Sequence, residues 1–525
     1  MADLKLKKNI LSTFKLNGYN LRNDVCIQLL ELLRPLEGSE REEWLEKFLE
    51  HIRGQSLTNA VVEKCHIDLA IQECIRSESD ETDLILNVID AFEVPRAMYN
   101  VERKKFEMVP NTKYTPSLFD VAQAKTDLFK NRYIILRQRT LRHSVFMPVM
   151  PGEDKEETVQ KFDLPLIEYL LSSSACLKDI IVLGLLTQMK EGRFYLEDPT
   201  GSVCLDLSGT KFHTGLHTEN CFVLAEGVYD DRVLHVKAIG FPPAESSETS
   251  RAYFGNLNVF GGPSPTNIKS SSKLFKIEQT NEDGIIVFIS DVWLDQIKVL
   301  QKLKVLFRGY SHFPPIAFVL MGNFLSTQHR STYAHTLKSC LKDLADIIAE
   351  YPPILQNSRF IFVPGPIDPA SANILPRTPL PKYVTKEFME KIPSAIFTSN
   401  PCRLQYCTKE IVILRHDMVT KLCRNTIHFP SDGEIPDHFA KTIVCQATLS
   451  PLPLTVCPIY WSFDNALSLY PLPDVVVVAD NFSAFTTSYM GCQVVNPGSF
   501  PKSEYSFKAY CPASNLIEDS QIPNE

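Results

Sequence analysis

The stretch "IIVFISDVWLDQ", residues Ile285 to Gln296, decides how we interpret the C-terminal half of the chain. Five apolar residues lead directly into Ser290 and Asp291, and the sequence then becomes amphipathic. An unbroken apolar run of this length is typical of a parallel strand that is buried on both faces. Because open α/β sheets bind ligands at the carboxyl ends of their strands, Asp291 is predicted to lie at such an edge. Its carboxylate could bind a metal, act as a nucleophile or have only a structural role.

Apolar runs of the same kind recur toward the C-terminus, and we predict an α/β domain over residues 283–525. Amphipathic stretches such as "HTLKSCLKDLADIIAEY" lie between the runs and are expected to form helices that cover the sheet. The further runs are "IAFVLMGN", "RFIFVPGPID", "IVIL" and "DVVVVAD".

A two-residue alternation of apolar and polar residues is found over residues 166–245. It predicts five short antiparallel strands with tight turns at "DPTG" and "YDDR", which resemble an OB-fold barrel. Such barrels bind single-stranded nucleic acids through aromatic and basic side chains, but they are also common packing modules. Acidic residues lie beside the basic ones in this sequence. The candidate nucleic-acid contacts are Lys190, Arg193, Tyr195 and Lys237.

The N-terminal part, residues 1–75, has the pattern of a bundle of short helices. Apolar residues recur at helical spacing, for example in "WLEKFLEHI", and a further helix is expected around Val61 and Val62. This part has no catalytic constellation, so we predict an interaction domain. Residues 76–165 are expected to form a linker and mixed segment that begins with a mobile acidic joint at 76–83 and includes a helix with a basic end. Residues 246–282 are expected to be a connecting segment.

The composition limits the functions that are open to the chain. Its 525 residues, 44% of them hydrophobic, suffice for several packed domains. The net charge of −8 argues against a general nucleic-acid coat, because nonspecific binding depends on neutralising phosphates. The spacing of Cys402, Cys407 and Cys423 fits a zinc site poorly, so reduced, buried thiols are expected. No signal peptide and no bilayer-spanning run are expected either.

The strand ends of the predicted α/β domain resemble those of the calcineurin-like phosphoesterases. Active members carry Asp-x-His, Gly-Asp, Gly-Asn-His-Asp/Glu and Gly-His-x-His at these places, where the residues hold two metals that activate a water. The corresponding stretches here are Ser290 to Trp293, Met321 to Phe324, Pro364 to Asp368 and Ala479 to Phe482.

Compared residue by residue, this chain lacks most of that ligand set. Asp291 matches the first aspartate, but Trp293 replaces the histidine and is expected to fill the volume of the lost imidazole and metal. Asn323 replaces the bridging aspartate, and proline and isoleucine replace Asn-His in the third motif, whose Asp368 is expected to bond its own loop. The sequence "RHD" at Arg415 to Asp417 is an alternative source of a histidine ligand. The predicted vestigial positions, without a metal, are Asp291, Trp293, Asn323, Asp368 and Asp480.

A barrel followed by a phosphoesterase domain without metal ligands resembles the B subunits of the eukaryotic replicative DNA polymerases. The stretches "SDVWLDQ", "SRAYFGNLNVFGGP", "FVPGPIDP", "NPCRLQYC" and "VVNPGSFPKSEYSFKAYCP" are similar to the B subunits of DNA polymerase epsilon. The resemblance covers essentially the whole chain. It implies an α+β multidomain fold with an N-terminal helical bundle like the lid of AAA+ ATPases, an OB-fold barrel and a C-terminal calcineurin-like phosphoesterase domain that lacks its metal ligands.

The resemblance also implies a nuclear structural subunit that is not an enzyme and needs no cofactor. The expected partners are the C-terminal metal-binding domain of the catalytic subunit of DNA polymerase epsilon, the CMG helicase with its GINS component and the small histone-fold subunits. DNA is expected mainly as an indirect partner, and no membrane is expected. Because the sequence has no Gly-Lys-Ser/Thr phosphate loop, ATP binding is not expected. The alternatives are a metal-dependent phosphodiesterase or nuclease, and an autonomous single-stranded DNA binder that uses the barrel.

Overall fold

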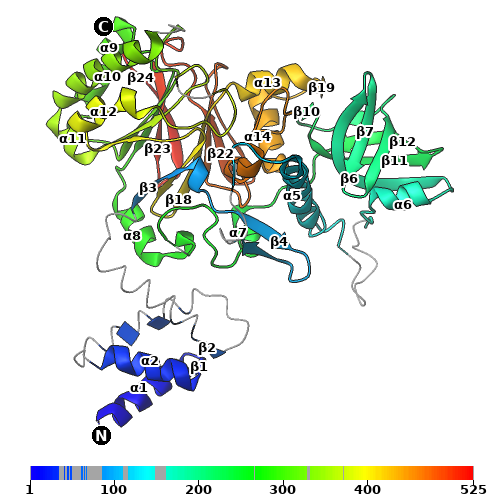
Figure 1. Ribbon diagram of the computed structural model, residues 1–525, viewed down its shortest axis with the longest axis horizontal. Helices are drawn as coiled ribbons and strands as arrows, with labels where there is room; N and C mark the ends of the chain where they lie inside the picture. The colour runs from blue at the N-terminus through cyan, green and yellow to red at the C-terminus, as the bar shows by residue number, and fades with distance from the viewer. Residues whose placement is uncertain are drawn as a thin grey trace.

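The computed structural model describes residues 2–34, scattered positions between 41 and 67, and residues 85–109, 116–147, 161–264, 266–327, 332–369 and 372–523. An N-terminal part, a β-barrel and a larger C-terminal domain make up this structure (Figure 1). The predicted acidic joint at 76–83 lies outside the described residues. In the described stretches, no helix has both the length and the apolar character needed to cross a bilayer.

The C-terminal domain contains two six-stranded mixed sheets. The first has the order β16 (Ala395–Phe397), β15 (Arg359–Val363), β14 (Ala317–Met321), β13 (Ile286–Ser290), β23 (Ser506–Cys511) and β24 (Leu516–Gln521). The second has the order β21 (Phe485–Tyr489), β22 (Cys492–Asn496), β20 (Val475–Ala479), β18 (Lys409–Arg415), β17 (Cys402–Tyr406) and β3 (Leu86–Asp90). Strands β13 to β16 are parallel to one another, as are β18, β20 and β22.

Alternating side chains of these strands fill the core on both faces of each sheet. In β13, Ile286 and Phe288 face the second sheet, whereas Val287 and Ile289 pack under the outer helices. The helices over the first sheet are α9 (Ile297–Tyr310), α10 (Tyr333–Ala349) and α12 (Lys382–Lys391), and those over the second are α13 (Met418–Asn425) and α14 (Ile435–Gln446). The prediction of a single sheet covered by helices is therefore wrong: the strands form two sheets packed face to face, with helices on both outer faces (Figure 1).

The segment predicted as a linker contributes a strand to this sandwich. Strand β3 pairs antiparallel with β17, and Ile89 packs in the core outside the second sheet. An antiparallel hairpin of β4 (Ala97–Asn100) and β5 (Lys105–Met108) follows. Residues 85–109 are therefore more than a connection, because the apolar stretch around Ile89 gains burial by pairing with a strand that is distant in sequence. The other elements here are η1 (Ala91–Glu93), α7 (Ser247–Arg251), η2 (Ile268–Ser270), α8 (Ser272–Thr280), α11 (Pro352–Asn357) and η4 (Trp461–Leu467).

The predicted alternating region forms a closed barrel beside the short helix α6 (Ile167–Ser172). Its strands are β6 (Leu177–Lys190), β7 (Arg193–Asp198), β8 (Gly201–Asp206), β11 (Phe222–Asp230) and β12 (Val233–Gly240), with β9 (Lys211–Phe212) added beside β12. Closure follows from the pairing of β11 with both β6 and β12, and from the parallel pairing of β12 with β8. The two-residue strand β10 (His217–Thr218) pairs with β19 (Thr426–His428) and ties the barrel to the C-terminal domain.

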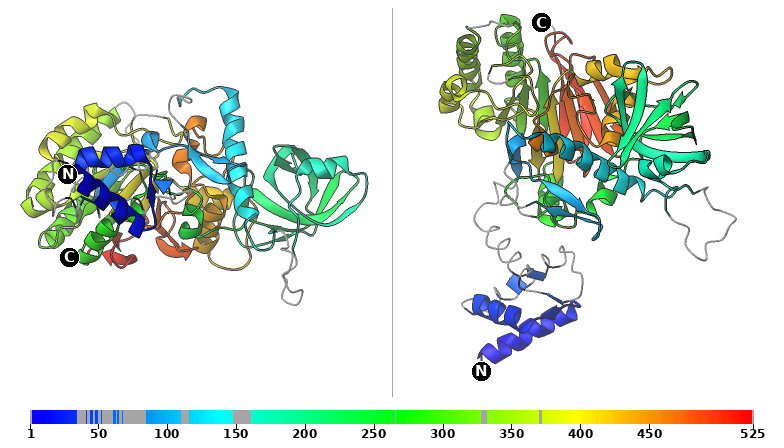
Figure 2. Two further views of the ribbon diagram at one scale, coloured as in Figure 1. Left: turned by 90° about the horizontal axis from the view of Figure 1, so that it is seen from below. Right: turned by 45° about the vertical axis from the view of Figure 1, so that its right-hand side comes forward.

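Helix α5 (Ala122–Thr140) lies between the barrel and the C-terminal domain (Figure 2). Arg139, which is 2% exposed, donates to the carbonyls of Pro242, beyond the barrel, and Cys445, in α14. Arg142, just past the helix, forms an ion pair of 2.7 Å with Glu245. The predicted basic end of this helix is thus used for contacts within the chain.

The N-terminal part contains α1 (Ala2–Leu16), α2 (Asn23–Leu33) and two short parallel strands, β1 (Asn20–Leu21) and β2 (Val61–Val62). Val61 and Val62 therefore lie in a strand and not in the predicted helix. This β-branched pair fits the extended backbone, which explains the difference. A separate apolar core forms from Leu6, Ile10, Phe14, Val25, Leu29, Leu33, Leu45, Phe48, Leu49, Ile52, Val62 and Ile67.

Candidate functional site

Three strand ends of the first sheet meet through direct hydrogen bonds. Asp291 follows β13, is 1% exposed and has a φ of 56°, a left-handed conformation that aspartate tolerates better than most residues. Its Oδ1 accepts the N–H of Asn323, after β14, at 3.2 Å. Asn323 Oδ1 in turn accepts the N–H of Ile367, after β15, at 3.0 Å. The structure therefore brings together the loops that the sequence predicted to converge.

Two glycines allow these loops to approach one another closely. A Cβ atom on Gly322 would lie 2.0 Å from Oδ2 of Asp368, and one on Gly365 would lie 2.5 Å from Oδ1 of Asn323. Neither distance is possible between real atoms, so any side chain at these positions would separate the loops. The glycines are needed for close packing of the strand ends, whatever the chemistry of the site.

A buried arginine that the sequence analysis did not select lies at the centre of the cluster. Arg415 is the last residue of β18 in the second sheet, and its side chain is fully buried. Its Nη2 donates to Oδ1 of Asp291 at 2.8 Å, and its Nε donates to the carbonyl of Gly322 at 2.6 Å. Its Nη1 donates to Asp417 at 3.0 Å and to the carbonyl of Ala479 at 3.1 Å. Arg415 thereby joins the ends of both sheets.

The charges around Arg415 are complementary. Burial alone would lower the pKa of Arg415, but the carboxylates of Asp291 and Asp417 raise it above its usual value. Burial acts to raise the pKa of Asp417, yet the charge of Arg415 and its hydrogen bonds keep that pKa lowered overall. The guanidinium is therefore held in its charged form between two carboxylates.

The other two acidic residues at the strand ends are bonded mainly by backbone N–H groups. Asp368 accepts the N–H of Gly365 at 2.7 Å, within its own loop, the N–H of Phe324 at 2.9 Å and the hydroxyl of Tyr333 at 3.0 Å. Burial raises the pKa of Asp368 in spite of these bonds.

Asp480, after β20, accepts the N–H groups of Val419 and Phe482, both at 2.8 Å. Burial is the main reason why the pKa of Asp480 is raised to about 6. Its two carboxylate oxygens are thus engaged by the backbone of its own loop and of the first turn of α13.

Trp293 follows the cluster residue Asp291 closely, and its backbone N–H donates to the carbonyl of Asp291 at 2.8 Å. Its indole is half-buried against the core under the outer helices, and the ammonium of Lys502 lies 5.5 Å from the ring centroid. The expectation that Trp293 fills the place of a histidine and a metal stays a prediction. The group in the centre of the cluster is the guanidinium of Arg415, which arrives from the opposite sheet.

The residues at the strand ends do not fit the two-metal centre of the phosphoesterases that the sequence resembles. Among the described residues, no group of three or more His, Cys, Asp or Glu side chains could hold a metal ion. His416, the histidine of "RHD", is 3% exposed, and burial lowers its pKa to about 3. Cys402 and Cys407 are buried free thiols, and burial raises the pKa of Cys407 to about 12.

The four candidate nucleic-acid contacts on the barrel do not form one face. Lys190 and Arg193 are cross-strand partners where β6 turns into β7, and Tyr195 is paired with Thr187 in the same hairpin. Lys237 of β12 instead forms an exposed ion pair of 2.6 Å with Asp179, near the other end of β6. The alternating sequence pattern predicts strands but not their register. It therefore could not show that Lys237 lies beside one end of β6 and the other three residues beside the opposite end.

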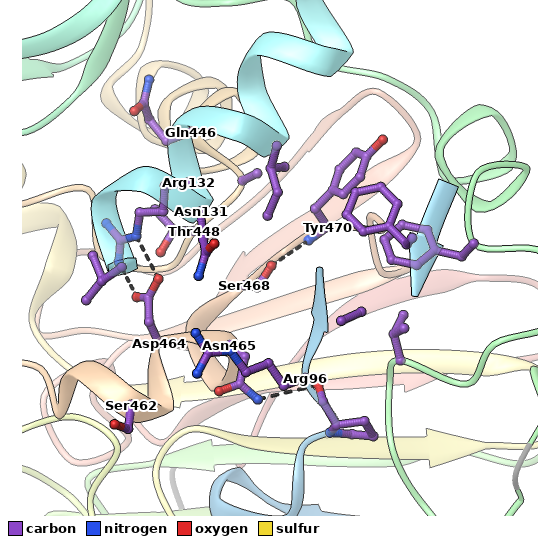
Figure 3. A pocket seen from close by; sticks show the side chains of 18 of the residues that line it. Arg96, Asn131, Arg132, Gln446, Thr448, Ser462, Asp464, Asn465, Ser468 and Tyr470 are labelled. Carbon is purple, nitrogen blue, oxygen red and sulfur yellow. Dashed lines mark hydrogen bonds and ion pairs between the residues drawn. The ribbon is translucent and has the colours of Figure 1, made fainter. Parts of the chain in front are cut away.

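A cavity of about 90 Å³ lies where α5 meets the C-terminal domain (Figure 3). Arg132 of α5 points toward Asp464 of η4, and the Nε–Oδ2 distance is 3.0 Å (Figure 3). Asn465 donates from its amide to the carbonyl of Val94 at 2.8 Å. The lining includes none of the strand-end residues, so this cavity belongs to the junction of α5 and not to the candidate site.

Comparisons with known proteins define the class to which this arrangement belongs. Residues 286–487 match the family of the B subunits of DNA polymerases alpha and epsilon. Residues 122–243 match the OB-fold domain of DNA polymerase epsilon subunit 2-like proteins, and residues 2–74 match the N-terminal family of DNA polymerases epsilon. The predicted barrel is confirmed by the OB-fold match together with the observed closure.

Full-length relatives identify the family. DNA polymerase epsilon subunit 2 of Bos taurus and that of Homo sapiens are each 50% identical to this chain over 524 residues, with 99% of both chains covered. The chain belongs to the DNA polymerase epsilon subunit 2 family, as the sequence resemblance predicted. A solved structure described as a novel archaeal phosphodiesterase is 11% identical, covers 45% of this chain and 98% of its own, and has a TM-score of 0.26. A TM-score this low supports no inference about the chain.

Proposed function

We propose that this protein is a non-catalytic accessory subunit of DNA polymerase epsilon that acts in chromosomal DNA replication in the nucleus. The observation that carries the proposal is the 50% identity to DNA polymerase epsilon subunit 2 over 99% of both chains. A match of this extent includes all three parts of the fold.

The strand-end cluster supports a structural role rather than hydrolysis. A two-metal hydrolase needs several carboxylate and imidazole ligands that converge on the metals and leave room for a water. In this chain Arg415 bonds Asp291 and Asp417, and the side-chain oxygens of Asp368 and Asp480 accept backbone N–H groups. These contacts leave the acidic side chains engaged within the protein.

The domain arrangement supports a division of binding roles. We assign contact with the C-terminal metal-binding domain of the polymerase catalytic subunit to the barrel and the C-terminal domain, which α5 holds together through Arg139 and Arg142. The N-terminal part has an apolar core of its own, and we assign it to the replicative helicase side, with GINS as the contact. The small histone-fold subunits are further candidate partners.

Co-expression with the C-terminal region of the polymerase epsilon catalytic subunit tests the proposal. We expect a one-to-one complex in size-exclusion chromatography with the full chain. A chain that lacks residues 1–75 should form the same complex, because the remaining domains carry the contact.

The matched control is a fragment of residues 1–75 alone, which should not retain the catalytic subunit. Retention by this fragment, together with loss of the complex when it is deleted, would reverse the assignment of roles. Manganese-dependent hydrolysis of a phosphodiester by the purified chain would instead favour an enzyme.

A further inference from the structure

The side chain of Arg415 crosses from one sheet of the C-terminal domain to the other. It starts from the last residue of β18 in the second sheet and bonds Asp291 and Gly322, which follow β13 and β14 in the first sheet. Within its own sheet it bonds the end of β20 through the carbonyl of Ala479. One side chain therefore connects four strand ends.

The guanidinium is well suited to this position because it is planar, permanently charged and carries five N–H donors. Each of its three nitrogens is used, and the donor–acceptor distances lie between 2.6 and 3.1 Å. Two acceptors are carboxylates and two are backbone carbonyls, so the cation is both neutralised and hydrogen-bonded by groups of the protein. The cost of burying a charge is smallest when both conditions hold.

We propose that the guanidinium of Arg415 is the built-in cation of the strand-end cluster, which holds the two sheets together and leaves no place for a divalent metal there. In this arrangement Asp291 and Asp417 face an internal cation, while backbone N–H groups and the Tyr333 hydroxyl engage Asp368 and Asp480. The inference deepens the proposed non-catalytic role by naming the residue that replaces the metal chemistry. It depends on the contacts of Arg415 and not on the identity of a polymerase partner.

The first experiment uses the unaltered full chain and manganese as the probe. The chain is treated with EDTA, and its melting temperature and stoichiometry of binding are measured with and without MnCl₂. We expect no stoichiometric binding and a change in Tm below about 1 °C, because a ligand that does not bind the native state does not stabilise it.

The second experiment removes the cation with Arg415→Ala and supplies it again as methylguanidinium. We expect the substitution to lower Tm by about 10 °C, because it leaves two carboxylates without their buried partner. Methylguanidinium at millimolar concentration should restore part of this loss. The control Arg193→Ala, at an exposed position of the barrel, should show neither the loss nor the recovery.

Arg415→Lys keeps the proposal testable if Arg415→Ala does not fold. A single ammonium cannot reach all four acceptors, so this variant should fold with a Tm below that of the unaltered chain. Stoichiometric manganese binding by the unaltered chain that Asp291→Asn abolishes would overturn the inference. A Tm unchanged in Arg415→Lys or Arg415→Ala would also overturn it. If the manganese and Arg415 experiments give the expected results but the chain does not form a complex with the catalytic subunit, only the proposed function is contradicted.

Discussion

Arg415 and Arg403 are two buried arginines of the second sheet with different acceptors. Arg415 donates to the carboxylates of Asp291 and Asp417 and to the carbonyls of Gly322 and Ala479. Arg403, in β17, donates only to backbone carbonyls. Those carbonyls belong to Val259, Phe260, Asn465 and Ser468, and all four distances are 3.1 Å.

The difference determines what each cation contributes. Burial lowers the pKa of Arg403 to about 10, and Glu410 opposes this only in part. The pKa of Arg415 is raised, because two carboxylates outweigh the same effect of burial. Arg403 therefore fixes the path of irregular backbone, whereas Arg415 balances charges that would otherwise be unpaired. The comparison teaches that the acceptors, and not the depth of burial, decide whether a buried arginine acts as a counter-ion.

The largest effect is expected when the counter-ion is removed. Arg415→Met leaves Asp291 buried without its partner, and we expect a loss of about 3–5 kcal/mol in the free energy of unfolding. The double variant Arg415→Met/Asp291→Asn should cost less than the sum of its single substitutions, because the unpaired charge is then absent. Chemical denaturation of the four proteins measures this coupling.

Arg403→Met combined with Asp291→Asn is the matched control for that cycle. The two side chains share no partner, so their effects should add to within about 0.5 kcal/mol. If the effects of Arg415→Met and Asp291→Asn on the free energy of unfolding are additive, Arg415 acts only through its bonds to the backbone, as Arg403 does. The two arginines would then not differ in function.

A smaller effect is expected from Asp480, a carboxylate of the strand-end cluster that Arg415 does not bond. Its pKa in the folded state is raised to about 6, mainly by burial, with Asp417 raising it further and Arg415 lowering it. The folded state therefore binds this proton more tightly than the unfolded chain does. The stabilisation is complete below the usual aspartate pKa and is lost as pH rises through about 6.

We expect the unaltered chain to lose about 1 kcal/mol relative to Asp480→Asn between about pH 5 and about pH 7.5. Denaturation curves of both proteins across this range measure the difference. Asp417→Asn is the matched control: the pKa of Asp417 is lowered, so its contribution is lost only below the usual aspartate pKa and no pH-dependent difference is expected in this range. A difference between the chain and Asp480→Asn that does not vary with pH would refute this assignment.

The smallest effect is expected at the exposed ion pair of the barrel. Lys237 and Asp179 are 53% and 66% exposed, so water and salt screen their interaction. Lys237→Ala should leave Tm unchanged, in contrast with every substitution of Arg415. Thermal melts at low and high salt measure this. A clear loss of stability would show that solvent exposure does not explain why the Lys237–Asp179 pair contributes less than the Arg415–Asp291 pair.

Much of the fold could be predicted from local pattern. Apolar runs such as Ile285 to Ile289 predicted buried strands, and the alternation over 166–245 predicted the barrel, because both patterns reflect which side chains leave water. Strand β3 was missed because its partner β17 is distant in sequence. Val61 and Val62 were assigned to a helix for a related reason, since their strand depends on pairing with Asn20 and Leu21.

The candidate site was predicted only in part. The convergence of Asp291, Asn323 and Asp368 followed from the common edge of parallel strands. Arg415 was not predicted, because an arginine is not a metal ligand and the adjacent His416 was the candidate in "RHD". The available signal was the sequence "IVILR", in which an apolar strand ends in a charge that needs a carboxylate partner.

The sequence by itself determined which residues could not serve as metal ligands, because tryptophan, proline and isoleucine lack the necessary donor atoms at the strand ends. It also indicated the family, through the stretches quoted between Ser250 and Pro512. Only the tertiary structure decided what occupies the centre of the cluster. Arg415 and Asp291 are separated by 124 positions in the sequence, and their pairing exists only because two sheets pack face to face with their strand ends at one edge.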